Sequence, residues 1–263
     1  MKKRIIQRQR GFSLIELSIV LIIIGLVTGG ILTGQSLIRA SQLRSVVTEF
    51  QRYETAVYTF RDEYNALPGD MRNAEKFWGS MTNCGVPNPS GTGTCNGNGD
   101  GTLYSALAPS ETGEGFMFWQ HLAKAGLIEG SYTGIAGPVS VRDFNFGENS
   151  PASKLTNAGW GIFNFDRTGV TGPGTAFSID FANHFEFGAE GDNIGADAAI
   201  LTPEEAWNID TKVDDGKPGL GNIIGGNSVN TCTTAVNQED FMTAEYLVSS
   251  STVGCSLRYI NIF

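Results

Sequence analysis

The chain has 263 residues, of which 41% are hydrophobic and 17% charged, and its formal net charge is −9. This length and composition allow a buried hydrophobic core and exclude the disordered class. The excess of 27 acidic over 18 basic residues argues against nucleic-acid binding as the main activity, because contacts to phosphates need clustered Lys and Arg. Such a surface suits calcium or basic partners better.

The N-terminus combines a basic stretch with a long apolar run. Residues 1–11 carry five basic side chains and no acid, so the rest of the chain has 13 basic residues against 27 acids and a net charge of −14. Leu17 to Ile38 contain no formal charge, and as a helix these 22 residues span ~33 Å, enough to cross a bilayer. The positive-inside rule places the basic stretch in the cytoplasm and the rest outside.

This arrangement differs from an ordinary secretory signal, which has a shorter apolar region and a small-residue cleavage site. Here Gly11 ends the basic stretch, Phe12 starts the apolar run at once, and Glu16 lies inside it. An ionisable group in a membrane segment costs ~2.5–3.5 kcal/mol at the bilayer centre and usually indicates a partner. The alternative is a plain single-span anchor in which Glu16 has no special role.

Gly11, Phe12 and Glu16 resemble the cleavage motif of type IV prepilins and type II secretion pseudopilins. The resemblance implies that a membrane peptidase cuts after Gly11 and methylates the new amino terminus of Phe12. It also implies that Glu16 pairs with the amino terminus of Phe12 in a neighbouring subunit. Such pairing lowers the cost of both charges and sets the axial register of the subunits.

The resemblance further implies an α+β, pilin-like fold, in which a long N-terminal helix precedes a globular domain with an antiparallel sheet. The domains are then a leader at 1–11, a helix at 12–65 and a periplasmic or extracellular globular domain at 66–263. The expected partners are other pilin or pseudopilin subunits, prepilin peptidase, the inner-membrane assembly platform and the membrane itself. The expected location is the inner membrane, with the leader cytoplasmic and the globular domain periplasmic, and then a pilus or pseudopilus.

Beyond the apolar run, the helix is expected to continue as an amphipathic segment. Apolar residues recur at spacings of three and four, while charged residues lie elsewhere around the helix. Pro68 and Gly69 follow it, so the helix covers about 50 residues, which corresponds to ~80 Å. The apolar positions are Leu43, Val46, Val47, Phe50, Tyr53, Val57, Phe60 and Tyr64, and the charged ones are Arg44, Glu49, Arg52, Glu54 and Arg61.

Four glycines interrupt the apolar half of this helix, and each weakens a helix by about 1 kcal/mol. They are Gly25, Gly29, Gly30 and Gly34. Two explanations stay open: close packing between membrane helices, or local melting when the subunit leaves lipid for a fibre.

The four cysteines lie in two sequence-local pairs without a CxxC motif, which disfavours a zinc site. Disulfides in an oxidising compartment are the better interpretation. Proximity favours Cys84 with Cys95 and Cys232 with Cys255, although four cysteines allow three connectivities and could also stay reduced and buried.

The remaining elements are expected in the following order. Residues 66–102 are expected to form a surface loop, and residues 115–128 a helix with His121 on its surface. Strands are expected at 139–146, 160–165 and 175–187, the last with an aromatic face at Phe177, Ile179, Phe181, Phe185 and Phe187. The alternating end at 255–263 predicts a last strand, tied to the sheet by the second disulfide.

No catalytic motif stands out, so an enzyme is not expected. The best candidate site follows a capping box at Thr202 and Glu205, which predicts a short helix ending near Asn208 and a loop carrying Asp210, Asp214 and Asp215. These carboxylates could bind Ca²⁺, which prefers six to eight oxygen ligands. The segment 96–101 is a weaker calcium candidate, since Asp100 is its only charge. For both segments the alternative is a solvated acidic turn.

Two functions are compatible with these features of the sequence. The first is a structural subunit, either a pilin or a pseudopilin, whose work is assembly. The alternative is a minor tip subunit that binds an adhesion target, a secreted substrate or DNA, with DNA opposed by the acidic surface.

Overall fold

The structure is a computed structural model that describes residues 13–104, 109–172, 174, 176–191, 194–226 and 231–261. The chain divides into two compact units, Met1–Ser41 and Gln42–Phe263. Gly11 and Phe12 lie outside the described residues.

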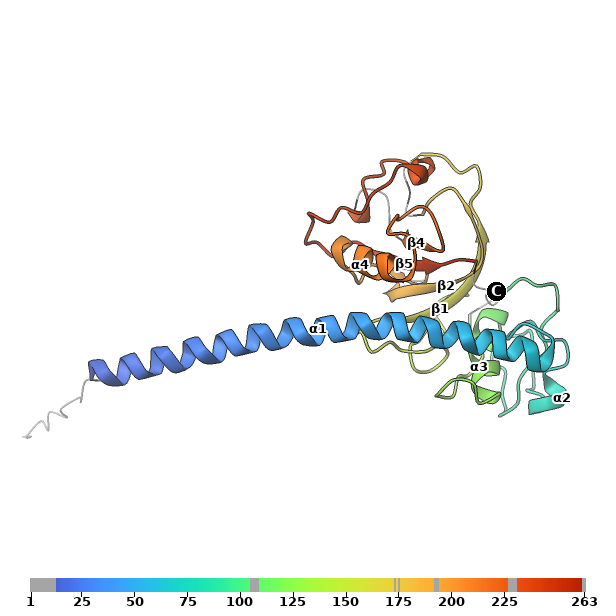
Figure 1. The fold of residues 1–263 in the computed structure, drawn as a ribbon. Coiled ribbons are helices and arrows are strands. Elements are labelled where there is room, and N and C mark those ends of the chain that lie inside the picture. Colours follow the sequence, from blue (N-terminus) through green and yellow to red (C-terminus); the bar gives the residue numbers. More distant parts are fainter. Residues whose placement is uncertain are drawn as a thin grey trace, which may run out of the picture. The chain divides into compact units, whose positions relative to one another are not determined.

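Helix α1 covers Leu14–Tyr64 and confirms the predicted long N-terminal helix (Figure 1). In the part from Gln42 onward, the predicted apolar face is buried at Val46, Phe50, Tyr53, Val57 and Phe60. Glu49 was expected on the charged, solvent-exposed face of the helix, but it is only 6% exposed. That expectation was wrong because Glu49 lies beside a loop and a strand that supply two hydrogen-bond donors.

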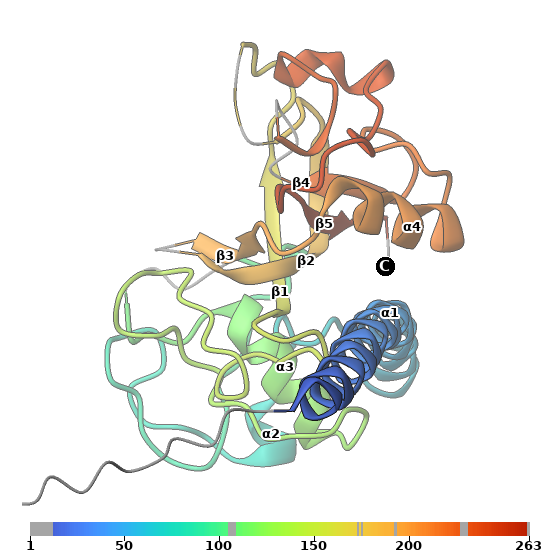
Figure 2. The same cartoon turned by 90° about the vertical axis from the view of Figure 1, so that its left-hand side faces the viewer.

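The second unit contains an antiparallel sheet in the order β1-β2-β5-β4, with β3 paired to β2 (Figure 2). The fold is therefore α+β and pilin-like. The strand at 160–165 and the last strand are confirmed, and the last strand begins directly after Cys255. The strands are β1 Gly159–Asp166, β2 Asp180–Gly191, β3 Ile194–Ala198, β4 Ile223–Gly226 and β5 Ser256–Tyr259.

A bulge in β2 changes the expected aromatic stripe. Between the pairs Asp166↔Asp180 and Asn164↔Asn183, β2 contains one more residue than β1. Ala182, with φ 48°, lies in this interval. An extra residue reverses the side-chain alternation. Phe181 consequently packs in a second core cluster, whereas Phe185 and Phe187 pack in the main one.

The helices of the second unit are short, and Figure 2 shows α4 beside β4 and β5. Helix α3 is close to the predicted helix at 115–128, and it packs on β1. The short helices of this unit are α2 Glu75–Trp78, α3 Glu114–Lys124, α4 Pro203–Val213 and the 3-10 helix η2 Gln238–Met242.

An aromatic cluster forms the centre of the main core. Phe50 of α1 stacks on Tyr259 of β5 with ring centroids 4.2 Å apart, and Tyr53 contacts Trp119 of α3 edge-on at 5.1 Å. Phe185 of β2 stacks on Trp119 at 5.6 Å. Side chains of this size dominate core energetics, so the upper part of α1 is an integral part of the second unit.

Two expectations about the loops were wrong. Residues 139–146 form turns rather than a strand, because Asn149 Nδ2 donates to the carbonyl of Asp143 and Asp143 Oδ2 accepts from the amide of Val139. The segment 66–102 is not all surface, since Met71 and Ala74 are buried in the main core.

Both predicted disulfides form. Cys84 pairs with Cys95 and Cys232 with Cys255, with Cα–Cα distances of 5.8 and 4.9 Å. The second one joins the loop after β4 to the first residue before β5.

Candidate functional site

At the N-terminus of α1, the Glu16 carboxylate accepts a hydrogen bond from the backbone of the same chain. The amide of Ser13 donates to Glu16 Oε2 at 2.8 Å, and Ser13 Oγ accepts from the amide of Ile15 at 3.3 Å. Helix starts leave amides without intrahelical partners, and a Ser followed three residues later by Glu satisfies two of them. The sequence signal for this arrangement, the S-x-x-E pattern at 13–16, was missed.

The apolar half of α1 is the one helix among the described residues that is long and apolar enough to cross a membrane. Its large apolar side chains are at least half exposed between Leu14 and Ile24. Its hydroxyl groups bond to carbonyls of the same helix: Ser18 to Leu14, and Thr28 to Ile24. Lipid offers no hydrogen bonds, so internal satisfaction of this kind suits a membrane segment.

The predicted acidic residues of the 202–222 segment do come together. Asp210, Asp214 and Asp215 each offer a carboxylate oxygen within 4.8 Å of the others. The capping box at Thr202 and Glu205 is confirmed. The helix it starts does not end near Asn208, however. It continues to Val213 because Ala206 and Ile209 bury its inner face, and Asp210 therefore lies in its last turn.

Asp210 is fully buried, and both of its oxygens accept hydrogen bonds. The hydroxyl of Tyr246 donates to Oδ2 at 2.8 Å and the amide of Gly216 to Oδ1 at 2.9 Å. Burial raises the pKa of Asp210 to about 7, although both of these bonds lower it. The carboxylates of Asp214 and Asp215 raise it further. Without a cation, ionised Asp210 is therefore costly near neutral pH.

The three carboxylates are oxygen ligands of the kind that suits a hard divalent cation. Asp214 Oδ2 accepts from the amides of Asn222 and Ile223, and Asp215 Oδ1 accepts from the amide of Lys217. Each of these carboxylates has a second oxygen, and oxygen ligands are those that Ca²⁺ takes.

A second acidic cluster joins Asp100 of the weaker candidate loop to Asp70 and Glu114. Asp70 accepts from the amides of Gly99 and Gly101, and Asp100 accepts from the amide of Thr102 at 2.8 Å. Burial and the neighbouring Asp70 raise the pKa of Glu114, although the amide bond from Asn98 lowers it. Because the amides of the 96–102 loop donate to these carboxylates, the acids hold the loop in place without a cation. No local pattern in the sequence indicates that residues 70 and 114 meet residue 100.

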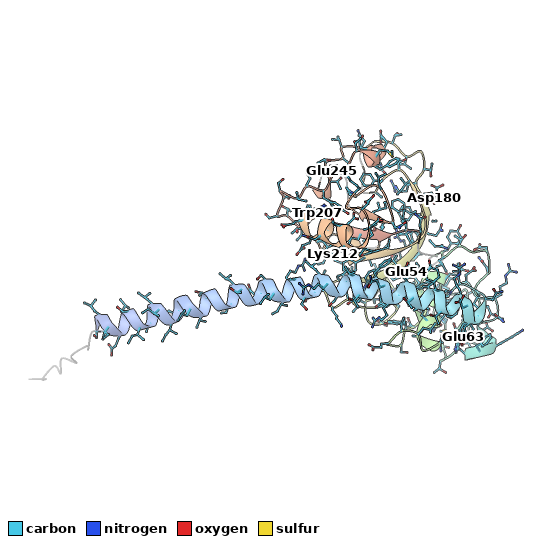
Figure 3. All side chains as sticks on the ribbon, viewed as in Figure 1. Glu54, Glu63, Asp180, Trp207, Lys212 and Glu245 are labelled. Carbon is cyan, nitrogen blue, oxygen red and sulfur yellow. A yellow bond between two sulfur atoms is a disulfide. The ribbon has the colours of Figure 1, made fainter. Side chains whose placement is uncertain are left out.

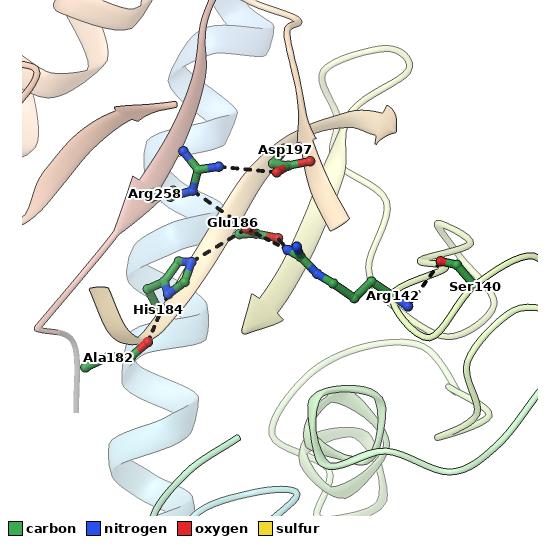
Figure 4. A network of polar contacts seen from close by, with 7 residues as sticks. All are labelled: Ser140, Arg142, Ala182, His184, Glu186, Asp197 and Arg258. Atoms are coloured by element: carbon green, nitrogen blue, oxygen red, sulfur yellow. Dashed lines mark hydrogen bonds and ion pairs between the residues drawn. The ribbon is translucent and has the colours of Figure 1, made fainter. Parts of the chain in front are cut away.

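A buried charge network lies on the face of the sheet opposite the main core (Figure 4). Glu186 of β2 is fully buried and accepts from Arg142 Nη2 at 2.9 and 3.0 Å, while Arg258 Nε lies 3.7 Å from it. Arg258 Nη2 also donates to Asp197 at 3.2 Å. Burial alone would raise the pKa of Glu186, but the two guanidinium groups and His184 hold it well below its usual range. Two arginines and two acids thus balance each other inside the fold.

His121 is buried, so the expectation of a surface histidine was wrong. Its Nδ1 accepts from the amide of Gly69 at 2.9 Å, which leaves Nε2 as the donor to Thr94 Oγ1 at 2.9 Å. Thr94 in turn donates to Gln120 at 2.6 Å. Burial lowers the pKa of His121 to about 3. The neutral ring joins the turn after α1 to α3 and to the loop closed by the first disulfide.

Comparison with known proteins gives one match. Residues 6–32 match the family model described as the prokaryotic N-terminal methylation motif, the signature of type IV prepilins and pseudopilins. No curated protein and no solved structure matches the chain. The match indicates a pilin- or pseudopilin-type subunit with a hydrophobic N-terminal helix, which is a structural class rather than an enzyme class.

Proposed function

We propose that this chain is a structural subunit of a type IV pilus or a type II secretion pseudopilus. The methylation motif at 6–32 carries the proposal, because it coincides with the exposed apolar half of α1. Prepilin peptidase removes residues 1–11, and the apolar helix anchors the mature chain in the inner membrane. The assembly platform then adds it to other subunits, and the apolar helices pack together in the fibre.

Mass spectrometry of the protein from cells with and without prepilin peptidase tests the processing step. The expected product begins at a methylated Phe12 only when the peptidase is present. An intact Met1 start in peptidase-containing cells would contradict the proposal.

The orientation follows from charge. The five basic residues of the leader stay in the cytoplasm, and residues 42–263 face the periplasm, where both disulfides can form. Protease added to spheroplasts should therefore digest the second unit. Full protection of that unit in spheroplasts, with digestion only after lysis, would reverse the orientation.

Glu16 provides the test of assembly. A carboxylate in an apolar segment gains by meeting the charged amino terminus of Phe12 in a neighbouring subunit. With a single gene copy, Glu16→Ala and Glu16→Gln should both lose fibres in sheared fractions, since neither side chain is charged. The matched control is Glu63→Gln, an exposed acid in the last turn of the same helix (Figure 3). Normal fibre yield from Glu16→Ala would exclude the pairing role.

A minor tip subunit is the second candidate. Two surface cavities of about 460 and 560 Å³ share Pro89, Thr133 and Ile135, so the loops around them form neighbouring hollows that an adhesion target or secreted substrate could enter. Quantitative proteomics of purified fibres separates the candidates. A shaft subunit should dominate the fibre protein, whereas a tip subunit should be scarce.

We also propose that Asp210, Asp214 and Asp215 bind Ca²⁺. Their carboxylates converge, and a cation would offset the cost of the buried Asp210 charge. Calcium should raise the melting temperature of the mature chain in detergent, and Asp214→Asn should remove most of that shift. Asp100→Asn, in the second acidic cluster, is the matched control and should keep it. An unchanged melting temperature in millimolar calcium would dispose of the site.

A further inference from the structure

The pair Ser13 and Glu16 carries a role that the charge of Glu16 does not explain. Glu16 Oε2 is engaged by the amide of Ser13 within the same chain, and the Ser13 hydroxyl accepts from the amide of Ile15. These contacts define where α1 begins, at Leu14. They also direct the Glu16 carboxylate back along the helix, toward the end at which the mature chain starts.

Two otherwise unsatisfied amides lie at the end of an apolar helix, where lipid cannot satisfy them. Glu16 supplies an acceptor to one, and Ser13 to the other. The same hydrogen bond lowers the cost of the carboxylate itself, since bonds from amides to an ionised acceptor are stronger than neutral ones. A carboxylate has two oxygens, so one capping bond does not exhaust its acceptor capacity.

We propose that Ser13 is a positioning residue for Glu16. In the unassembled subunit Glu16 caps the Ser13 amide and Ser13 caps the Ile15 amide, a two-bond box that orients the Glu16 carboxylate before a neighbouring amino terminus arrives. The assembly half of this inference rests on the proposed function. The capping half concerns the single chain and can be measured without any fibre.

The chemistry of capping allows the two roles of Glu16 to be separated. Gln at the third helical position accepts the same bond from the N-cap amide as Glu does, so Glu16→Gln keeps the box and removes only the charge. Glu16→Ala removes both. Ser13→Ala removes the hydroxyl acceptor, whereas Ser13→Thr keeps it, because Thr is also a good N-cap residue.

Amide hydrogen exchange, followed by NMR on the full-length mature chain in detergent micelles, tests the box. The Ser13 amide should exchange about fivefold faster in Glu16→Ala than in the wild type, and at the wild-type rate in Glu16→Gln. The Ile15 amide should exchange about fivefold faster in Ser13→Ala and be restored in Ser13→Thr. If Glu16→Ala leaves Ser13 exchange unchanged, the box does not hold and the inference is overturned.

Fibre yield tests the positioning. Ser13→Ala should lower the yield severalfold although Glu16 is intact, and Ser13→Thr should restore it. Equal yields from Ser13→Ala and the wild type would overturn the positioning role even if exchange confirms the box. If the wild-type chain itself formed no fibre, the proposed function would fail, and the exchange experiment would still decide whether the box exists.

Discussion

Glu49 Oε2 accepts a hydrogen bond of 2.9 Å from the indole nitrogen of Trp160, across 111 residues of sequence. Its other oxygen accepts from the amide of Lys154 at 2.9 Å. A single buried carboxylate on α1 thus fixes both the loop before β1 and a core side chain of β1. Since α1 otherwise contacts the core through apolar side chains, Glu49 supplies directionality to that contact.

Replacing Glu49 should destabilise the second unit. Glu49→Ala leaves the buried indole of Trp160 and the partly buried amide of Lys154 without their acceptor, which should cost about 2–4 kcal/mol in the free energy of unfolding. Denaturant unfolding of the mature chain in detergent, followed by tryptophan fluorescence, measures this. Glu63→Gln, exposed on the same helix, should change stability by less than about 0.5 kcal/mol. Equal effects of the two substitutions would contradict the role assigned to Glu49.

His121 should make the fold sensitive to acid. Its folded pKa, about 3, lies below the ordinary value of 6.5, so only the unfolded chain takes up this proton between those values. The stability associated with the neutral ring is complete above pH 6.5 and falls as the pH drops, by roughly 1.4 kcal/mol per pH unit.

The check for His121 is the pH dependence of unfolding between pH 7 and pH 4. His121→Asn should be less stable at pH 7, because it loses ring packing against Phe60 and Trp78, but should show a flatter pH dependence. Parallel curves for the wild type and the variant would exclude His121 as the source of acid sensitivity.

Asp210 should have the opposite dependence. Its folded pKa, about 7, lies above the ordinary 3.8, so the folded chain holds this proton more tightly. That contribution is complete below pH 3.8 and is lost as the pH rises toward 7. In a chelator, Asp210→Asn should therefore gain stability relative to the wild type between pH 5 and pH 8. A difference independent of pH would contradict the raised pKa.

If calcium binds the ionised form of Asp210, its effect should also depend on pH. The calcium-induced rise in melting temperature should be larger at pH 8 than at pH 5.5, because binding at the lower pH must displace a proton. Thermal unfolding at both pH values with calcium or chelator measures this. An equal shift at both would show that Asp210 is not a ligand.

The charge network around Glu186 should be far more sensitive than an exposed ion pair. Glu186→Gln leaves Arg142 and Arg258 without their shared counter-charge in the interior, which should cost about 3–5 kcal/mol. Glu245→Gln removes the partner of Lys217 on the surface and should cost less than about 1 kcal/mol. Similar unfolding midpoints for the two variants would show that the network contributes no more than a surface pair.

Local patterns in the sequence were sufficient for much of the fold. The C-terminal end of α1 before Pro68, the capping box at Thr202 and both disulfides depend on residues close in sequence, and the structure has all of them. The approach of Asp210, Asp214 and Asp215 could be predicted for the same reason. At this site only the end of α4 differed, because burial of Ile209 continues the helix to Val213, past its expected end.

Several failures, in contrast, involve residues whose environment comes from distant parts of the chain. Glu49 and His121 look like surface residues on amphipathic helices until the loop at 154 and the turn at Gly69 cover them. Asp70 and Glu114 join Asp100 only because the 96–102 loop folds over the start of α3. Helical periodicity carries no information about such coverage.

The extra residue at Ala182 reverses the alternation of side chains along β2. Odd-numbered residues before it and after it therefore face opposite sides of the sheet, so Phe181 packs in the second core cluster while Phe185 and Phe187 pack in the main one. Substitutions along β2 affect one cluster at a time. Deleting residue 182 would remove the bulge and leave Phe181 and Phe185 three residues apart, so regular alternation would still direct them to opposite faces of β2. A strand of the same length without the bulge would instead place both side chains on one face and take Phe181 out of its cluster.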